Sequence, residues 1–156
     1  KMERRHPHIF GDSTHSPGWE TIKAAEREAH PDGSALAGVT LALPALMRAE
    51  KLQKRAARAG FDWPDPSGPR AKIVEEMAEV DADPCAEEVG DLLVSGVNWA
   101  RHLGFDPEVA LRSANDKCER RFRAMEAFAG SDFKALSLDE KEKLWNRAKA
   151  TEISAP

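Results

Sequence analysis

Two pairs of carboxylates, separated by a stretch that must reverse the chain, constrain this sequence more than any other feature. Glu76 and Glu79 form the first pair, and Glu88 and Asp91 form the second. Each pair is spaced three residues apart, so within a helix both side chains leave from one face. The Asp81-Ala-Asp-Pro84 segment between the pairs predicts a tight turn. Two antiparallel helices joined by this turn would bring all four acids to a common level.

A cluster of four acids predicts a bound cation. Adjacent carboxylates repel and raise each other's pKa, and a divalent cation relieves that repulsion. Oxygen ligands with no Cys or His among them favour a hard ion, Mg²⁺ or Mn²⁺. We therefore predict a metal site formed by four residues, Glu76, Glu79, Glu88 and Asp91. A phosphate-bearing compound is the substrate that such a site would take.

Prolines and capping residues that start helices alternate along the chain with glycines that end them. They predict helices over residues 19–29, 44–58, 70–80, 84–103, 107–129 and 138–150. Residues 61–69 are too rich in proline for regular structure, and Ser137 with Glu140 forms a capping box. No stretch shows sustained strand-like alternation between hairpin turns, so the predicted fold class is all-α.

The second acid-bearing helix carries two stripes of different chemistry. The apolar stripe is predicted to face the core and comprises Val89, Leu92, Leu93, Gly96, Ala100 and Leu103. The polar stripe comprises Glu88, Asp91, Ser95, Asn98 and His102. Asp, Asn and Ser are poor choices for a purely solvated helix face, so the polar stripe is predicted to line a cleft. The plainer interpretation is that it only meets water.

Composition excludes several classes of protein. Among 156 residues, 27 acidic side chains outnumber 23 basic ones, and the net charge of −4 argues against a nucleic-acid-binding surface. No run of 18 apolar residues exists, so we expect no membrane span. Cys85 and Cys118 have no disulfide framework around them, which predicts reduced thiols in a cytoplasmic protein.

A short internal echo bears on domain organisation. Residues 1–6, Lys-Met-Glu-Arg-Arg-His, resemble residues 117–122, Lys-Cys-Glu-Arg-Arg-Phe. Residues 7–18 are rich in proline, glycine and histidine, as in a linker. We expect residues 1–18 to be a linker and the tail of a preceding domain, and residues 19–152 to form the main domain.

Basic residues stand near the acids in the sequence. Lys72 lies four residues before Glu76 on the same helical face, and Lys117 and Arg121 are spaced i, i+4 on a later helix. These cations could grip the oxygens of a polyphosphate that a metal bridges to the acids. They could equally be ordinary surface charges, and spacing alone leaves both interpretations open.

Seven stretches that run in order through nearly the whole chain begin at residues 4, 19, 43, 60, 87, 97 and 114. They include Gly60-Phe-Asp-Trp, Glu87-Glu-Val-Gly-Asp-Leu-Leu and Val97-Asn-Trp-Ala-Arg-His-Leu-Gly. These stretches resemble the MazG family of all-α nucleoside triphosphate pyrophosphohydrolases. The family motif Glu-Glu-x-x-Glu followed by Glu-x-x-Asp is carried by Glu75, Glu76, Glu79, Glu88 and Asp91.

This resemblance implies an antiparallel helical bundle with a four-helix core and extra helices, assembled as a homodimer. It implies that the four acids bind Mg²⁺ and that Lys72, Lys117 and Arg121 contact the triphosphate. Trp145 would lie against the nucleotide, although from the residues alone core packing is the simpler role for this side chain. Asn98 and Asn115 stand in matched motifs and are further candidates for substrate binding.

The implied reaction is hydrolysis of a nucleoside triphosphate between its α and β phosphates, with Glu75 or Glu79 accepting the proton of the attacking water. Residues 80–87 between the acid pairs form a shorter gap than is usual in the family. Pro84 and Cys85 also stand where some relatives have a basic residue. The alternative is a non-catalytic helical module that senses nucleotides or mediates dimerisation.

Overall fold

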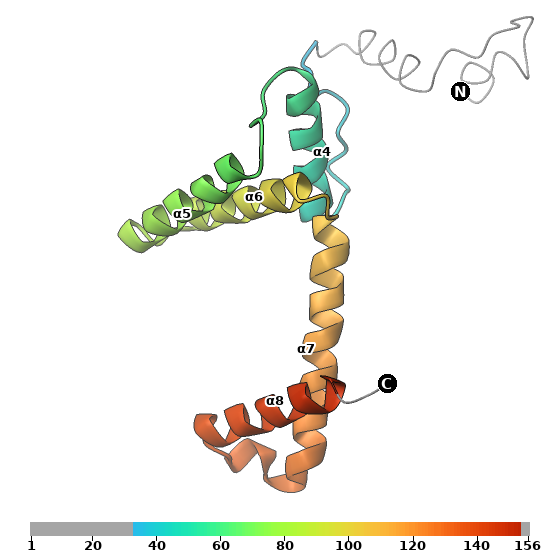
Figure 1. Ribbon diagram of the computed structural model, residues 1–156, viewed down its shortest axis with the longest axis vertical. Helices are drawn as coiled ribbons and strands as arrows, with labels where there is room; N and C mark the ends of the chain where they lie inside the picture. Colours follow the sequence, from blue (N-terminus) through green and yellow to red (C-terminus); the bar gives the residue numbers. More distant parts are fainter. Residues whose placement is uncertain (1–32, 154–156) are drawn as a thin grey trace, which may run out of the picture. The chain divides into compact units, whose positions relative to one another are not determined.

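The computed structural model describes residues 33–153, and all the regular secondary structure within that range is helical (Figure 1). The elements are α4 (Ala45–Arg58), α5 (Ser67–Ala82), α6 (Ala86–His102), α7 (Pro107–Ala129), the 3₁₀ helix η1 (Gly130–Ala135) and α8 (Leu138–Ile153). No strand occurs among the described residues, so the all-α prediction is confirmed. None of the described helices is both long and apolar enough to cross a membrane.

The helix boundaries follow from local chemistry. Gly60 and Gly104 take positive φ angles of +88° and +82° just after α4 and α6, a conformation that glycine adopts without strain. Asp106 caps α7 by accepting a hydrogen bond from the backbone N–H of Val109 at 3.0 Å. The predicted capping box of α8 is confirmed: Ser137 N–H donates to Glu140 Oε2 at 2.8 Å, and Glu140 N–H donates to Ser137 Oγ at 3.3 Å.

Helix α5 starts earlier than predicted. It begins at Ser67 rather than at residue 70, so the irregular segment after α4 is shorter than residues 61–69. Asp65 Oδ1 accepts a hydrogen bond from Ser67 N–H at 2.7 Å just before the helix. Pro69 is tolerated within the first turn because the N–H groups of that turn have no intrahelical acceptor. The 3₁₀ helix η1 was also not expected.

The chain forms two compact units, one ending at Gly104 and the other beginning at Phe105. The predicted helix over residues 19–29 and the predicted linker over residues 1–18 lie outside the described residues. The extent of the main domain, residues 19–152, therefore stays a prediction. Cys85 in the first unit and Cys118 in the second are free thiols.

In the first unit, α5 and α6 form a helical hairpin, and α4 packs against α6 (Figure 1). The hairpin closes over Asp83, Pro84 and Cys85, with Cys85 at the N-cap of α6. Asp83 N–H donates to the carbonyl of Glu79 at 2.9 Å, which completes the last turn of α5. The predicted pair of acid-bearing helices joined by a tight turn is confirmed, but Asp81 and Ala82, predicted to lie in the turn, belong to α5.

The two stripes of α6 are not buried and exposed as predicted. Leu93 is 58% exposed and Val89 is 44% exposed, whereas Ser95 and Asn98 on the polar stripe are each only 8% exposed. The apolar stripe was predicted to face the core. In the single chain this prediction is wrong for Val89, Leu93 and Leu103, whose side chains are exposed. The physical reason is that α4 packs beside the polar stripe, where Gln53 Nε2 donates to the carbonyl of Val94 at 2.9 Å.

The second unit consists of α7, η1 and α8. Met125 on α7 and Ala148 on α8 are buried, and Pro107 at the start of α7 is also buried. Phe133 of η1 meets Phe122 of α7 edge to face, with ring centroids 5.3 Å apart. The 3₁₀ turn therefore anchors the connection between α7 and α8 through an aromatic contact.

Candidate active site

Three carboxylates meet where α5 and α6 run side by side. Glu76, Glu79 and Glu88 each offer one oxygen, and these oxygens lie within 4.8 Å of one another. The predicted convergence of the acid pairs is thus observed for three of the four residues. Asp91 lies one turn further along α6, is exposed, and is not part of this three-oxygen group. Its role as a ligand stays a prediction.

Glu76 is the buried member of the group, with 3% of its surface exposed. Its Oε1 accepts an ion-pair contact from Lys72 Nζ at 2.7 Å, whereas its buried Oε2 receives no hydrogen bond from the described residues. The Lys72 contact lowers the pKa of Glu76, and the contact with Glu76 raises the pKa of Glu79. Two acids at this spacing do not both ionise freely without a compensating charge.

Lys72 supplies part of that compensation. Its Nζ lies 2.6 Å from Glu75 Oε1, 2.7 Å from Glu76 Oε1 and 4.0 Å from Glu79 Oε2. Hydrogen bonds to Glu75 and then to Glu76 raise the pKa of the ammonium above its ordinary value. The predicted placement of a base on the face of the first acid pair is confirmed.

The cluster of three carboxylates, Glu76, Glu79 and Glu88, fits a hard divalent cation for two reasons. All its donors are oxygens, which Mg²⁺ and Mn²⁺ prefer, and they come close enough together to share one ion. In addition, Glu76 Oε2 is a buried oxygen without a donor, an arrangement that costs free energy unless something else binds it. A cation at this position would satisfy that oxygen and remove the repulsion among the three acids.

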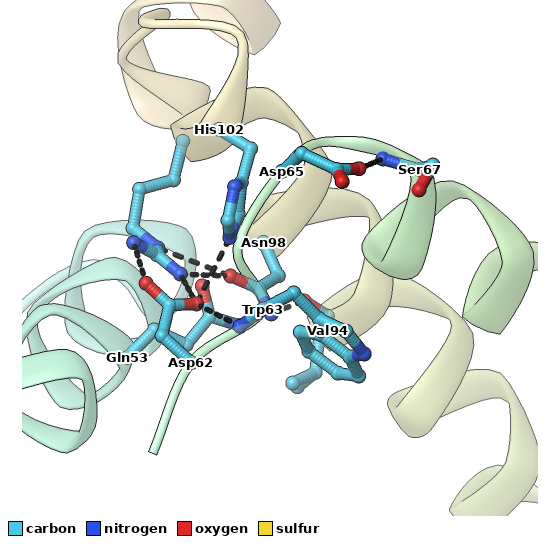
Figure 2. Close-up of polar contacts among 9 residues, drawn as sticks. Gln53, Asp62, Trp63, Asp65, Ser67, Val94, Asn98 and His102 are labelled. Carbon is cyan, nitrogen blue, oxygen red and sulfur yellow. Dashed lines mark hydrogen bonds and ion pairs between the residues drawn. The ribbon is translucent and has the colours of Figure 1, made fainter. Parts of the chain in front are cut away.

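A pocket of about 300 Å³ opens in the same unit, further along α6. We call it the Trp63 pocket; its lining comes from α4, α6 and the loop after α4, and comprises Gln53, Ala56, Gly60, Phe61, Asp62, Trp63, Asn98 and Arg101. Figure 2 shows Asp62, Asn98 and His102 converging beside Trp63 and Gln53. Asn98, expected from the sequence to bind substrate, therefore lies in a pocket.

An ion-pair network fixes one side of the Trp63 pocket. Arg101 donates from Nη1 to Asp62 Oδ2 at 2.9 Å and from Nη2 to Asp62 Oδ1 at 2.5 Å. The same guanidinium donates from Nε and Nη2 to Asn98 Oδ1, at 3.0 and 2.6 Å. His102 Nε2 lies 2.9 Å from Asp62 Oδ1 (Figure 2). The Arg101 hydrogen bonds, followed by that of His102, lower the pKa of Asp62 to about 2.

This shift predicts a pH-dependent stability. Because the Asp62 pKa falls from 3.8 to about 2 on folding, the folded state binds fewer protons than the unfolded state between these values. The stabilisation is therefore complete above pH 3.8 and is lost as the pH falls toward 2. It should amount to on the order of 1 kcal/mol, since the carboxylate is partly screened by solvent.

Asp62→Asn should lower stability at neutral pH and flatten this acidic limb. Urea unfolding of both proteins from pH 2 to pH 6 would check the expectation. An equally steep acidic limb in the variant would show that other carboxylates control it.

Trp63 rests directly on Gly68 in the first turn of α5. A methyl group at position 68 would overlap with Cδ1 and Cγ of the indole, so Gly68→Ala should displace Trp63. We expect a loss of about 1–3 kcal/mol, as for other insertions into a packed contact. Gly90→Ala is the matched control, because a Cβ at this helical glycine meets nothing within 4 Å.

The control should gain about 0.5–1 kcal/mol from the better helix propensity of alanine. Urea unfolding measures both variants, and the emission of Trp63 reports its displacement. Equal stability changes in the two variants would contradict the packing argument.

The remaining candidates belong to the second unit. The Arg121 guanidinium lies 5.5 Å from the centre of the Trp145 ring and 2.8 Å from Glu152 Oε2. The structure therefore brings Arg121 and Trp145 together, with Trp145 only partly buried. Lys117 and Asn115 are exposed on α7. The roles of these four residues toward a substrate stay predictions.

Sequence reasoning did not single out Gln53, Asp62, Trp63 or Arg101. Three of them stand in two stretches that carry the family resemblance, Gly60-Phe-Asp-Trp and Val97-Asn-Trp-Ala-Arg. Their presence in these two stretches was the signal in the sequence that could have identified them as site residues. Asp62 and Arg101 are 39 residues apart, so no local spacing rule could pair them.

Comparison with known proteins adds independent information, although no family model matches the chain. The nucleoside triphosphate pyrophosphohydrolase of Escherichia coli K12 is 43% identical over 171 residues, an alignment that covers 98% of this chain. The nucleoside triphosphate pyrophosphohydrolase/pyrophosphatase MazG of Thermotoga maritima is 41% identical over 161 residues, covering 96% of this chain. The chain belongs to the MazG family.

These MazG relatives are longer than the chain, which spans 65% of the Escherichia coli protein and 62% of the Thermotoga maritima protein. A further relative, the Bacillus subtilis protein YabN, is 42% identical over 169 residues, and the chain spans 34% of its length. A sequence similar to this chain therefore also occurs within a substantially larger protein.

Proposed function

We propose that this chain hydrolyses nucleoside triphosphates between the α and β phosphates, giving a nucleoside monophosphate and pyrophosphate, with Mg²⁺ or Mn²⁺ as cofactor. The observation that carries the proposal is the three-carboxylate group of α5 and α6 with Lys72 beside it. Two MazG relatives named as nucleoside triphosphate pyrophosphohydrolases support the same reaction.

Each candidate residue takes a defined role in this proposal. Glu76, Glu79, Glu88 and Asp91 would hold the metal, which when bound offsets phosphate charge and lowers the pKa of a coordinated water. Lys72 would move from the carboxylates to phosphate oxygens. In the second unit, Lys117 and Arg121 would neutralise the departing pyrophosphate, and Trp145 and Asn115 would contact the nucleotide.

Glu75 is the better candidate for the base that takes the proton of the attacking water. It lies beside the cluster and contacts Lys72 at 2.6 Å, but it is not among the three grouped carboxylates. A carboxylate that is not needed as a metal ligand keeps its lone pairs for a proton. Glu79 is a member of the group, which makes it the second choice.

We also propose that the chain forms a homodimer through the exposed apolar side chains of the α5–α6 hairpin. Val74 and Met77 on α5 and Val89, Leu93 and Val94 on α6 are exposed in one chain. Apolar surface in this amount favours association, because burying it releases the water around it. A second hairpin packed on this face would complete the four-helix core that the family resemblance implies.

The reaction is tested by product analysis. The protein is incubated with each NTP and dNTP, with and without Mg²⁺, and the products are separated by ion-exchange chromatography. Monophosphate and pyrophosphate formed only with the metal would support the proposal, whereas diphosphate and phosphate would overturn the assigned bond. Nucleotide that is bound but unchanged would favour the alternative, a nucleotide-sensing module.

A further inference from the structure

We propose that the Trp63 pocket binds the base of the nucleotide, as a neutral heteroaromatic ring whose edge carries both a hydrogen-bond donor and an acceptor. This inference rests on the proposed function and deepens it, because it assigns specificity to residues of the first unit. The pocket volume of about 300 Å³ is of the size that takes a small planar ligand.

The charges around the pocket are already balanced. Arg101 directs Nη1 and Nη2 to the Asp62 carboxylate and Nε to Asn98, so its guanidinium is committed to protein acceptors. His102 also contacts Asp62. A phosphate would have to break this bidentate pair to reach the arginine. The pocket therefore favours an uncharged group over the phosphate end of a nucleotide.

Two amide side chains in the pocket have fixed orientations. Gln53 is oriented by its Nε2 bond to the carbonyl of Val94, at 2.9 Å, and its buried Oε1 receives no hydrogen bond from the described residues. Asn98 is oriented by Arg101, which occupies its Oδ1 and leaves Nδ2 as a donor. One acceptor and one donor are therefore in place, and a base edge that carries the complementary pair would satisfy both.

Aromatic side chains provide the stacking surface. Trp63 lines the pocket, is 40% exposed, and is held by its contact with Gly68. Phe61 also lines the pocket and is 81% exposed. Any of the nucleotide bases can stack on a rigid indole whose surface is accessible. The Trp63 pocket thus combines a stacking wall with two oriented amide side chains.

The position of the pocket along α6 matches the shape of a nucleotide. Asn98 follows Asp91 by seven residues, close to two turns, so both lie on the same side of the helix about 10 Å apart. Phosphates held at the acid end and a base held at the Asn98 end would be joined by the ribose of one molecule. Both ends of this arrangement belong to the first unit.

Binding of nucleosides without metal tests the pocket separately from catalysis. Adenosine, guanosine, cytidine and uridine are titrated into the full chain, and the indole N–H signals are followed by NMR. Trp63→Leu identifies the Trp63 signal by its loss. We expect a saturable shift of that signal with at least one nucleoside; shifts confined to the other tryptophans, or no shift, would overturn the inference.

Kinetics with Mg²⁺ supply a second readout. Trp63→Leu should lower kcat/KM for the preferred NTP by about tenfold or more and flatten the ranking of bases, whereas inhibition by tripolyphosphate, which has no base, should not change. Phe105→Leu is the control, since this aromatic is 64% exposed and does not line the pocket. An unchanged base ranking in Trp63→Leu would overturn the inference while leaving the proposed reaction intact.

The two proposals fail in distinguishable ways. If the wild-type chain forms no product but nucleosides shift the Trp63 signal, the proposed reaction is wrong and the pocket stands as a nucleoside site. If product forms but no nucleoside shifts that signal, the reaction stands and the pocket assignment is wrong.

Discussion

Glu76→Gln should abolish Mg²⁺-dependent pyrophosphate release, with a loss of at least about 100-fold in kcat/KM, since even residues that only orient metal ligands contribute 10–100-fold. Glu76 is the buried member of the carboxylate group, and its unpartnered Oε2 is the oxygen that most requires a cation. The amide keeps the shape of the side chain but removes its charge. Pyrophosphate release measures the activity, and titration calorimetry with Mn²⁺ measures the metal site.

Glu87→Gln is the matched control for this prediction. Glu87 is exposed in the first turn of α6 next to Glu88, but it is not part of the carboxylate group. It should retain activity and metal affinity, and both variants should keep the helical circular dichroism of the wild type. Full turnover in Glu76→Gln would exclude this cluster as the catalytic metal site. Equal losses in the two variants would indicate a general effect of charge.

Leu93→Glu should dissociate the proposed dimer and is the second change with a large expected effect. Leu93 is 58% exposed at the centre of the apolar stripe of α6. A carboxylate buried there without a partner costs about 3 kcal/mol or more, which raises the dimer dissociation constant by at least about 100-fold. Sedimentation velocity over a range of protein concentrations measures the change.

The control for Leu93→Glu is Leu138→Glu, in which the same substitution is made at a leucine that is 72% exposed at the start of α8. It should leave the association state unchanged, because position 138 is outside the proposed face. A wild-type chain that sediments as a monomer at all concentrations would contradict the dimer proposal directly.

Helix positions could be predicted from this sequence because the signals that set them are local. Asp106, Ser137 and the glycines at positions 60 and 104 act on backbone groups within a few residues. The orientation of α6 could not be predicted in the same way. Periodicity shows that Val89 and Leu93 share a face, but which face finds a partner within the chain depends on where α4 packs.

In the candidate site too, contacts between residues close in sequence could be predicted, and contacts between distant residues could not. The contact between Lys72 and Glu76 follows from helical spacing alone, and the approach of Glu88 follows from the short turn. The Trp63 pocket depends on pairs distant in sequence, such as Asp62 with Arg101 and Gln53 with Val94. Their geometry arises only when α4 and the loop after it pack onto α6, a tertiary event with no local signature.

The contact between Trp63 and Gly68 makes the two positions interdependent. Any side chain at position 68 overlaps with the indole, so a larger residue there is compatible only with a smaller one at position 63. Single substitutions at position 68 should all be destabilising, and paired substitutions at 63 and 68 would reveal the tolerated combinations. Gly68 does not line the Trp63 pocket, but it leaves the space that the Trp63 indole needs. Replacing Trp63 to change base preference would therefore require a matching change at position 68.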